Sequence, residues 1–274
     1  MRYLKVLLVA LSAVALSANA QNAKEAPGTD TNQSNEAIAK ELANPLANLI
    51  QVPFQYNYYQ NAGPDKKDTV QAVLFQPVIP LAINKDYNYI VRPVVTLETI
   101  GNGSGGSNSG MGPTMIETFF SPNTDSNFLW GAGPVLQMPS SAYQYGSKQW
   151  GAGVSAVAMY RPGHWTMGLL GYQTFNIGGS SLGGTANNSY VQPFIAFTAK
   201  TATTVTLMAQ GSFNNDAKSA SIPIYLTVSQ LFRLDKLPVQ FAIGPAYYAA
   251  SAPNGPSGWG GRASISFVLP KSMF

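Results

Sequence analysis

The sequence predicts an all-β fold: a closed antiparallel transmembrane β-barrel of about twelve strands after a short N-terminal periplasmic segment. The first observation is a two-residue alternation of apolar and polar side chains, repeated in segments of about ten residues. This is the length of a tilted strand that crosses a bilayer. The second is that only 10% of the residues are charged, against about 25% in an ordinary soluble domain. The third is an export signal at the N-terminus.

Residues 1–20 have the three parts of a secretory signal peptide. Arg2 and Lys5 precede the apolar run LLVALSAVAL, and Ala18-Asn19-Ala20 is a small-x-small cleavage site before Gln21. The apolar run is shorter than the roughly 20 residues of a membrane-spanning helix, so a cleaved signal is favoured over an anchor. Its removal leaves a net charge of 14 − 12 = +2, which gives no argument for nucleic acid as a partner.

Residues 21–48 are predicted to be a periplasmic leader. Ser34-Asn35-Glu36 is a start signal for a short helix through EAIAKELA. A disordered leader is an equal alternative. The chain has no Cys, so strand pairing and barrel closure, rather than disulfides, must stabilise the domain predicted over 49–274.

The strands follow in order after the leader. Alternation is clearest in 220–231, where Ile222, Ile224, Leu226 and Val228 oppose Tyr225, Thr227 and Ser229. It is least regular in 69–81. The predicted strands are 49–60, 69–81, 89–99, 114–121, 127–138, 149–160, 165–176, 189–198, 204–213, 220–231, 238–249 and 259–269.

The connections between these strands alternate in length, as in bacterial outer-membrane barrels, which have short periplasmic turns and longer external loops. The longer set is 61–68, 100–113, 139–148, 177–188 and 250–258, with 214–219 as a short member. The shorter set is 82–88, 122–126, 161–164, 199–203 and 232–237. An even strand count then places both termini in the periplasm, and the protein in the outer membrane of a Gram-negative bacterium.

Tryptophans and prolines give two further expectations. All four Trp fall near predicted strand ends on the lipid-facing parity, where aromatic girdles lie: Trp130, Trp150, Trp165 and Trp259. Seven prolines inside strands each remove a ladder hydrogen bond, and we expect bulges or bends shared by neighbouring strands: Pro53, Pro77, Pro93, Pro134, Pro193, Pro223 and Pro245. Pro270-Lys271 indicates that the last strand ends at Leu269, before Phe274.

Long stretches of the chain resemble the outer-membrane family of meta-pathway phenol-degradation proteins, whose members often carry transporter or neuromedin U labels. The stretches are NPLANLIQVPFQYNY (44–58), QPVIPL (76–81), TFFSP (118–122), WGAGPVLQMP (130–139), GSKQWGAG (146–153), YVQPFIAFTAKTATTVTL (190–207), IPIYLTVSQL (222–231), PVQFAIGPAYYA (238–249) and WGGRASISFVLPK (259–271). The resemblance implies an outer-membrane barrel that moves small hydrophobic or aromatic compounds. It carries over no binding residues.

Charged residues on the inward parity are candidates for a constriction that sets selectivity, as rings of charge do in pores. They are Arg92, Glu98, Glu117, Arg161 and Arg262. Hydrated or paired charges without a selective role are the simpler alternative. Inward aromatic residues form a second group, either a track for aromatic solutes or a filling of a narrow lumen: Tyr59, Phe119, Tyr172, Tyr190, Phe194, Tyr225 and Tyr248.

An enzymatic barrel is the rival class, and the sequence argues against it. A serine hydrolase needs a His base beside its nucleophile, and the single His, His164, falls in the tight turn RPGHW. Glu98 and Glu117 are the only candidates for paired carboxylates. The stretch GNGSGGSNSGMG (101–112) lacks the Lys-Ser/Thr ending of a phosphate loop, and no metal-ligand spacing occurs.

We therefore expect passage of small molecules through a narrow lumen, with no cofactor, metal or catalysis. Lipid, a small solute and the barrel assembly machinery are the expected partners. A structural or surface-binding barrel is the first alternative, and a soluble secreted β-protein is the second.

Overall fold

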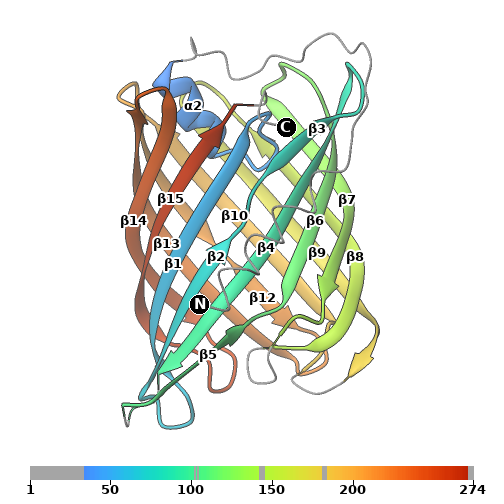
Figure 1. Ribbon diagram of the computed structural model, residues 1–274, viewed down its shortest axis with the longest axis vertical. Helices are drawn as coiled ribbons and strands as arrows, with labels where there is room; N and C mark the ends of the chain where they lie inside the picture. The colour runs from blue at the N-terminus through green and yellow to red at the C-terminus, as the bar shows by residue number, and fades with distance from the viewer. Residues whose placement is uncertain (1–33, 102, 104, 142–145, 181–183, 271–274) are drawn as a thin grey trace.

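The computed structural model describes residues 34–101, 103, 105–141, 146–180 and 184–270. These residues form one short helix, α2 (Asn35–Leu42), and a closed antiparallel barrel (Figure 1). The strands are β1 (Ile50–Ala62), β2 (Asp68–Phe75), β3 (Ile79–Ala82), β4 (Tyr87–Gly101), β5 (Ser107–Met111), β6 (Thr114–Pro122), β7 (Phe128–Met138), β8 (Lys148–Tyr160), β9 (Trp165–Ser180), β10 (Asn188–Thr198), β11 (Thr203–Ala209), β12 (Gly211–Asn214), β13 (Ser219–Leu234), β14 (Leu237–Ala250) and β15 (Gly258–Leu269). The predicted signal peptide, the first part of the leader and Phe274 lie outside the described residues.

The fifteen strands occupy twelve positions around the barrel, because three pairs of strands lie end to end. β2 and β3 both pair with β4, β5 and β6 also both pair with β4, and β11 and β12 both pair with β10 and β13. The first and last strands close the barrel, from Ile50 opposite Leu269 to Tyr59 opposite Gly260. Each of the twelve predicted segments corresponds to one of these positions, so the predicted fold class and strand number are confirmed.

The distribution of apolar and polar side chains is that of a barrel in lipid rather than that of a soluble sheet. In β13, Leu226 and Val228 are 49% exposed on the outside, whereas Thr227 and Ser229 are buried in the interior. The same inversion occurs in β11, where Val205 is exposed and Thr204 is buried. An apolar exterior around a polar interior is the arrangement expected when lipid lies outside and water inside.

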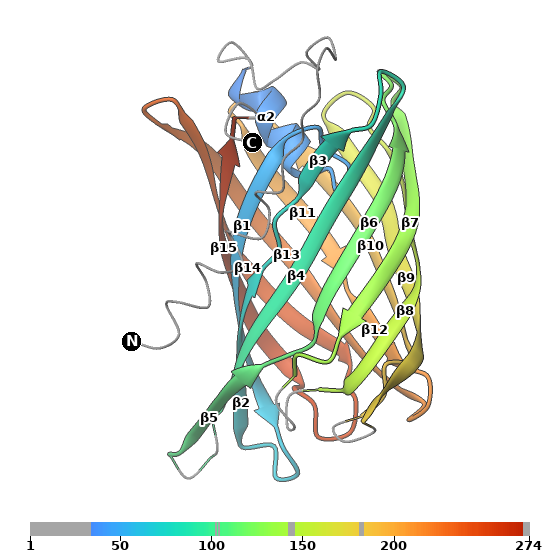
Figure 2. The ribbon, with the colours of Figure 1, turned by 45° about the vertical axis from the view of Figure 1, so that its right-hand side comes forward.

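The two ends of the barrel differ. The end that carries α2 has the short connections, such as 161–164 and 235–236, and is called the helix end here (Figures 1 and 2). The opposite end, called the loop end, has the longer connections, such as 251–257. No helix in the part of the chain that the structure describes has the length and hydropathy of a membrane span.

Prolines lie where the strand pairing is interrupted. Pro77, in the gap between β2 and β3, lies opposite Pro93 of β4. Neither residue has an N–H to donate, so Gln76–Val78 forms no ladder pairs with β4. This is the irregularity that makes 69–81 the least regular predicted strand. Pro223 lies at a register shift between β13 and β14. Pro53 and Pro193 stay in regular ladders with β15 and β9, but on their other sides Pro53 faces the interruption at Gln76 and Pro193 faces the break between β11 and β12. The expectation of irregularities shared by neighbouring strands therefore holds at these places.

Two Gly-Pro pairs interrupt ladders in a different way. The β6–β7 ladder is broken opposite Gly133-Pro134, and the β13–β14 ladder is broken opposite Gly244-Pro245. A Cβ at Gly244 would lie 1.9 Å from the Leu226 carbonyl oxygen. Proline removes the donor and the adjacent glycine lets the facing carbonyl approach closely, which is why both residues stand together.

Candidate functional site in the barrel lumen

Arg92 and Glu117 form an ion pair inside the barrel. They lie directly opposite each other on β4 and β6, because strand register brings inward-facing residues of neighbouring strands together. Arg92 Nη1 donates to Glu117 Oε2 at 3.1 Å, with side chains 14% and 5% exposed. A pair this deeply buried carries its charges only because each satisfies the other.

The ion pair continues into a row of amides. Arg92 Nη2 donates to Gln76 Oε1 at 2.9 Å, and Gln76 Nε2 donates to Gln55 Oε1 at 3.3 Å. Gln55 in turn donates to Asn57 on the same strand. Gln76 belongs to the interruption caused by Pro77, so the irregular segment supplies one member of the network.

Arg262 extends the network from β15 across the lumen. Its Nε donates to Asn57 Oδ1 at 2.8 Å and its Nη2 to Gln210 Oε1 at 2.8 Å. Its guanidinium lies 3.3 Å from the centre of the Tyr225 ring, which is a cation–π contact. Gln210 occupies the break between β11 and β12.

The network ends on β10, where Gln210 donates to Gln192 at 3.2 Å and Tyr190 donates to the same Gln192 oxygen at 2.6 Å. We call the whole network the polar belt. Its members are Glu117, Arg92, Gln76, Gln55, Asn57, Arg262, Gln210, Gln192 and Tyr190.

Two cavities lie on either side of the polar belt, with Gln76, Arg92 and Gln210 lining both. The cavity toward the helix end has a volume of about 220 Å³ and the cavity toward the loop end about 530 Å³. The polar belt is therefore a constriction between two chambers of the lumen.

The helix-end cavity is bounded by the N-terminal segment, residues 35–49, called the plug here. Ala39, Leu42 and Asn44 line it. Leu46 is buried in an apolar cluster of inward-facing side chains that includes Phe119 and Phe194. A Cβ at Gly131 would lie 2.9 Å from Leu46 Cδ2, so a glycine here makes room for the plug.

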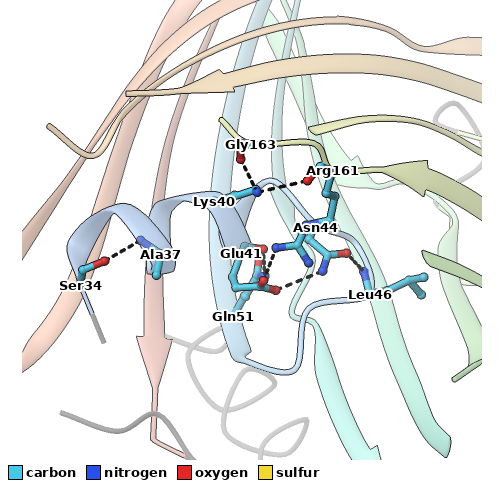
Figure 3. Close-up of polar contacts among 9 residues, drawn as sticks. All are labelled: Ser34, Ala37, Lys40, Glu41, Asn44, Leu46, Gln51, Arg161 and Gly163. Atoms are coloured by element: carbon cyan, nitrogen blue, oxygen red, sulfur yellow. Dashed lines mark hydrogen bonds and ion pairs between the residues drawn. The ribbon is translucent and has the colours of Figure 1, made fainter. Parts of the chain in front are cut away.

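Sequence chemistry explains how the plug is shaped (Figure 3). The Ser34 hydroxyl accepts a hydrogen bond from the Ala37 N–H at 3.1 Å and caps α2. After the helix, the Leu46 N–H donates to Asn44 Oδ1 at 2.8 Å, a local turn that directs Leu46 into the barrel. The helix predicted after Ser34 is therefore present.

Polar contacts hold the plug to the turn between β8 and β9 (Figure 3). Glu41 pairs with Arg161, and Lys40 Nζ donates to the carbonyl oxygens of Arg161 and Gly163. Burial, followed by the neighbouring Arg161 charge, lowers the pKa of Lys40. Glu36 lies 3.1 Å from His164 Nδ1, so the single His contacts the plug. We call these contacts the latch.

The inward aromatic residues divide between the two chambers. Phe119 and Phe194 pack around Leu46 at the helix end. Toward the loop end, Tyr59 and Tyr225 share a hydrogen bond of 2.6 Å, and Tyr248 packs edge-on against Tyr59 at 5.2 Å. Tyr172 and Tyr190 stack at 5.0 Å. All seven predicted aromatic residues thus lie inside the barrel.

The structure separates the five predicted charges into three places. Arg92, Glu117 and Arg262 meet in the polar belt. Glu98 lies six residues from Arg92 on β4, about 20 Å along the strand, and lines the loop-end cavity. It does not approach Glu117. Arg161 lies just past the end of β8, beyond the strand alternation that suggested a lumenal position, and contacts the plug instead.

The amides of the polar belt were missed by reasoning on charges and aromatic residues alone. A signal for two of them exists, because Gln76 and Gln192 each precede a proline inside a strand. All four Trp are exposed on the outer surface near strand ends, with Trp130 and Trp165 toward the helix end and Trp150 and Trp259 toward the loop end. No cluster of three potential metal ligands occurs among the described residues.

No family model matches the chain, and no curated protein matches it either. Among solved structures, the chain is similar to an outer membrane channel from Pseudomonas putida F1, with 13% identity and a TM-score of 0.60 over 81% of this chain and 95% of that chain. This likeness shows a shared fold. Two other solved barrels align less closely. They are outer membrane phospholipase A from Escherichia coli (10% identity, TM-score 0.41, covering 80% and 96%) and a Pseudomonas aeruginosa FadL homologue (10%, 0.37, covering 89% and 98%).

Proposed function

We propose that this protein is a gated outer-membrane channel for small molecules, exported by its signal peptide and inserted by the barrel assembly machinery. The observation that carries the proposal is a lumen with two chambers joined at a polar belt of charged and amide side chains. A purely structural barrel does not require two chambers separated by a charged constriction. The similarity to the Pseudomonas putida channel supports the same assignment.

In this proposal the helix end faces the periplasm and the loop end faces the outside. The short connections at the helix end and the longer ones at the loop end support this orientation. The exposed Trp near both ends support insertion between the two lipid–water interfaces, which indole rings favour. The aromatic residues that line the lumen favour small aromatic or hydrophobic solutes, as the resemblance to the phenol-degradation family also implies. No catalytic step is part of the proposal, since His164 is engaged with Glu36 and the Thr198 carbonyl.

Ion selectivity tests the proposal. Arg92 and Arg262 against Glu117 give the polar belt a net charge of +1, so the channel should favour anions. Glu117→Gln raises this charge to +2 and should shift the reversal potential in a salt gradient toward anion selectivity. Arg262→Gln lowers it to zero and should shift the potential the opposite way.

Lys236→Gln is the matched control, because Lys236 is an exposed charge in the turn between β13 and β14. It should leave the reversal potential nearly unchanged. Equal potentials for all four proteins would mean that the polar belt is not in the ion path, and the proposed passage would be rejected.

A structural or surface-binding barrel is the second candidate, and the plug is the observation that favours it. Residues 35–49 fill the helix end with buried contacts from Ile38, Ala39 and Leu46. If refolded protein gives no conductance steps even when the plug is removed, the structural role is the better account.

A further inference from the structure

Glu98 is a lumenal carboxylate with room around it. Its paired neighbours on either side are Ala72 on β2 and Gly110 on β5, so no bulky side chain flanks it. It lines the loop-end cavity and is partly buried. Among the described residues, no Lys, Arg or His nitrogen lies within ion-pair distance of it, whereas Glu117 is paired with Arg92.

The charges on the cavity wall leave an excess of negative charge. Arg92, Glu98 and Glu117 are the ionisable acids and bases that line it, apart from tyrosines, and they sum to −1. The Arg92 charge is satisfied by Glu117 and Gln76, and Arg262 lines the other cavity. The excess therefore rests on Glu98, and an unpaired carboxylate in a narrow lumen is stabilised by an added cation.

Two tyrosine rings line the same cavity as this carboxylate. Tyr248 packs edge-on against Tyr59, with the two ring centres 5.2 Å apart. The faces of aromatic rings attract cations, most strongly where water is partly excluded, and a carboxylate next to such rings is a common setting for an ammonium group.

We propose that the loop-end cavity binds small organic cations, with the ammonium group between Glu98 and the rings of Tyr59 and Tyr248. The apolar or aromatic part of the ligand lies toward the apolar wall next to Glu98, formed by Ala72 and Leu74. The volume of about 530 Å³ is within the range of ligand pockets. This inference rests on the proposed function and names a ligand class for the loop-end chamber, whereas the net charge of the polar belt sets the ion preference of the passage.

Binding of three probes that share a phenethyl group tests the inference, with calorimetry on the detergent-solubilised mature protein at mildly alkaline pH. Phenethylamine is cationic, 2-phenylethanol is neutral and 3-phenylpropionate is anionic. The cation should bind about tenfold more tightly than the neutral probe, and the anion more weakly than either. A preference for 3-phenylpropionate, or equal binding of all three, would overturn the inference.

Variants locate the site. Glu98→Gln keeps the shape and removes the charge, and should abolish the preference for phenethylamine. Asp65→Asn, in the exposed loop between β1 and β2, is the matched control and should keep it. Glu98→Lys should reverse the preference toward 3-phenylpropionate. Unchanged preference in Glu98→Gln or Glu98→Lys, in protein that retains heat-modifiable migration, would contradict the site.

Conductance of the same preparations separates this inference from the channel proposal. Conductance steps without charge discrimination in the binding assay would keep the channel and reject the cation site. Phenethylamine binding that depends on Glu98 but without any conductance would support the site and reject passage.

Discussion

The two arginines of the polar belt are stabilised by different chemistry. Arg92 is held by the carboxylate of Glu117 and by Gln76, whereas the partners of Arg262 among the described residues are two amide oxygens and the face of Tyr225. Removing one partner of a buried ion pair leaves the other charge unsatisfied, and this cost exceeds the net stabilisation that the pair provides. Amide and aromatic partners leave a positive charge available to passing anions.

Glu117→Leu should therefore lower the free energy of unfolding by about 3–5 kcal/mol, because Arg92 stays buried without its carboxylate. Urea unfolding in lipid vesicles measures this. The double variant Arg92→Met/Glu117→Leu should recover most of the loss. A double variant as unstable as Glu117→Leu would show that the pair itself, rather than the orphaned charge, determines stability.

Gly244 and Gly261 offer a matched pair of glycines on neighbouring strands. A Cβ at Gly244 would lie 1.9 Å from a backbone oxygen, whereas at Gly261 the nearest atom is at 3.9 Å. Gly244→Ala should destabilise the barrel by about 1–3 kcal/mol, since the backbone must move, and Gly261→Ala should have little effect. Unfolding midpoints of the two variants test this, and equal midpoints would contradict it.

At the scale of elements, the latch and a buried apolar face together hold the plug. α2 buries chiefly Ile38 and Ala39, which lie in an apolar cluster with Leu231 and Val268 of the barrel. Single partly exposed ion pairs are worth about 0–1 kcal/mol. The latch is therefore the weaker part of the attachment, and the buried side chains of Leu46, Ala47 and Leu49 hold the rest of the plug.

Arg161→Glu should raise the open probability in single-channel recordings, because it places a negative charge against Glu41. The reciprocal exchange Glu41→Arg/Arg161→Glu should restore the wild-type value. Failure of the exchange to restore it, while Arg161→Glu changes gating, would show that Arg161 acts through other contacts.

Asp216 gives the loop end a pH dependence. Thr185 and Asn187 donate hydrogen bonds to its carboxylate, and these bonds lower its pKa. A lowered folded-state pKa stabilises the contact above the unfolded pKa, and this stabilisation is lost as the pH falls through the folded pKa. Proteolysis between β9 and β10 should therefore accelerate at acidic pH, and Asp216→Asn should be cut rapidly at neutral pH as well. Equal cleavage of both proteins at neutral pH would contradict this role.

At the scale of the whole molecule, the features that depend only on residues close together in the chain are predictable from the sequence. The alternation of Leu226 and Thr227 fixes which face meets lipid, and Ser34 marks the start of α2. Strand register is a global property, so the sequence did not distinguish Glu98 from Glu117 as the partner of Arg92. The opposition of Pro77 and Pro93 also depends on register, which is why Gln76 was missed. The docking of the plug depends on its fit to Gly131 and Arg161, which no periodicity reveals.

Single-channel conductance of the mature protein, compared with that of a chain lacking residues 35–49, is the decisive test of a gated passage. We expect small steps for the mature protein and larger steps without the plug, both with the anion preference set by the polar belt. Identical conductance of the two proteins, or silence from both when correctly folded, would contradict a gated passage through this lumen.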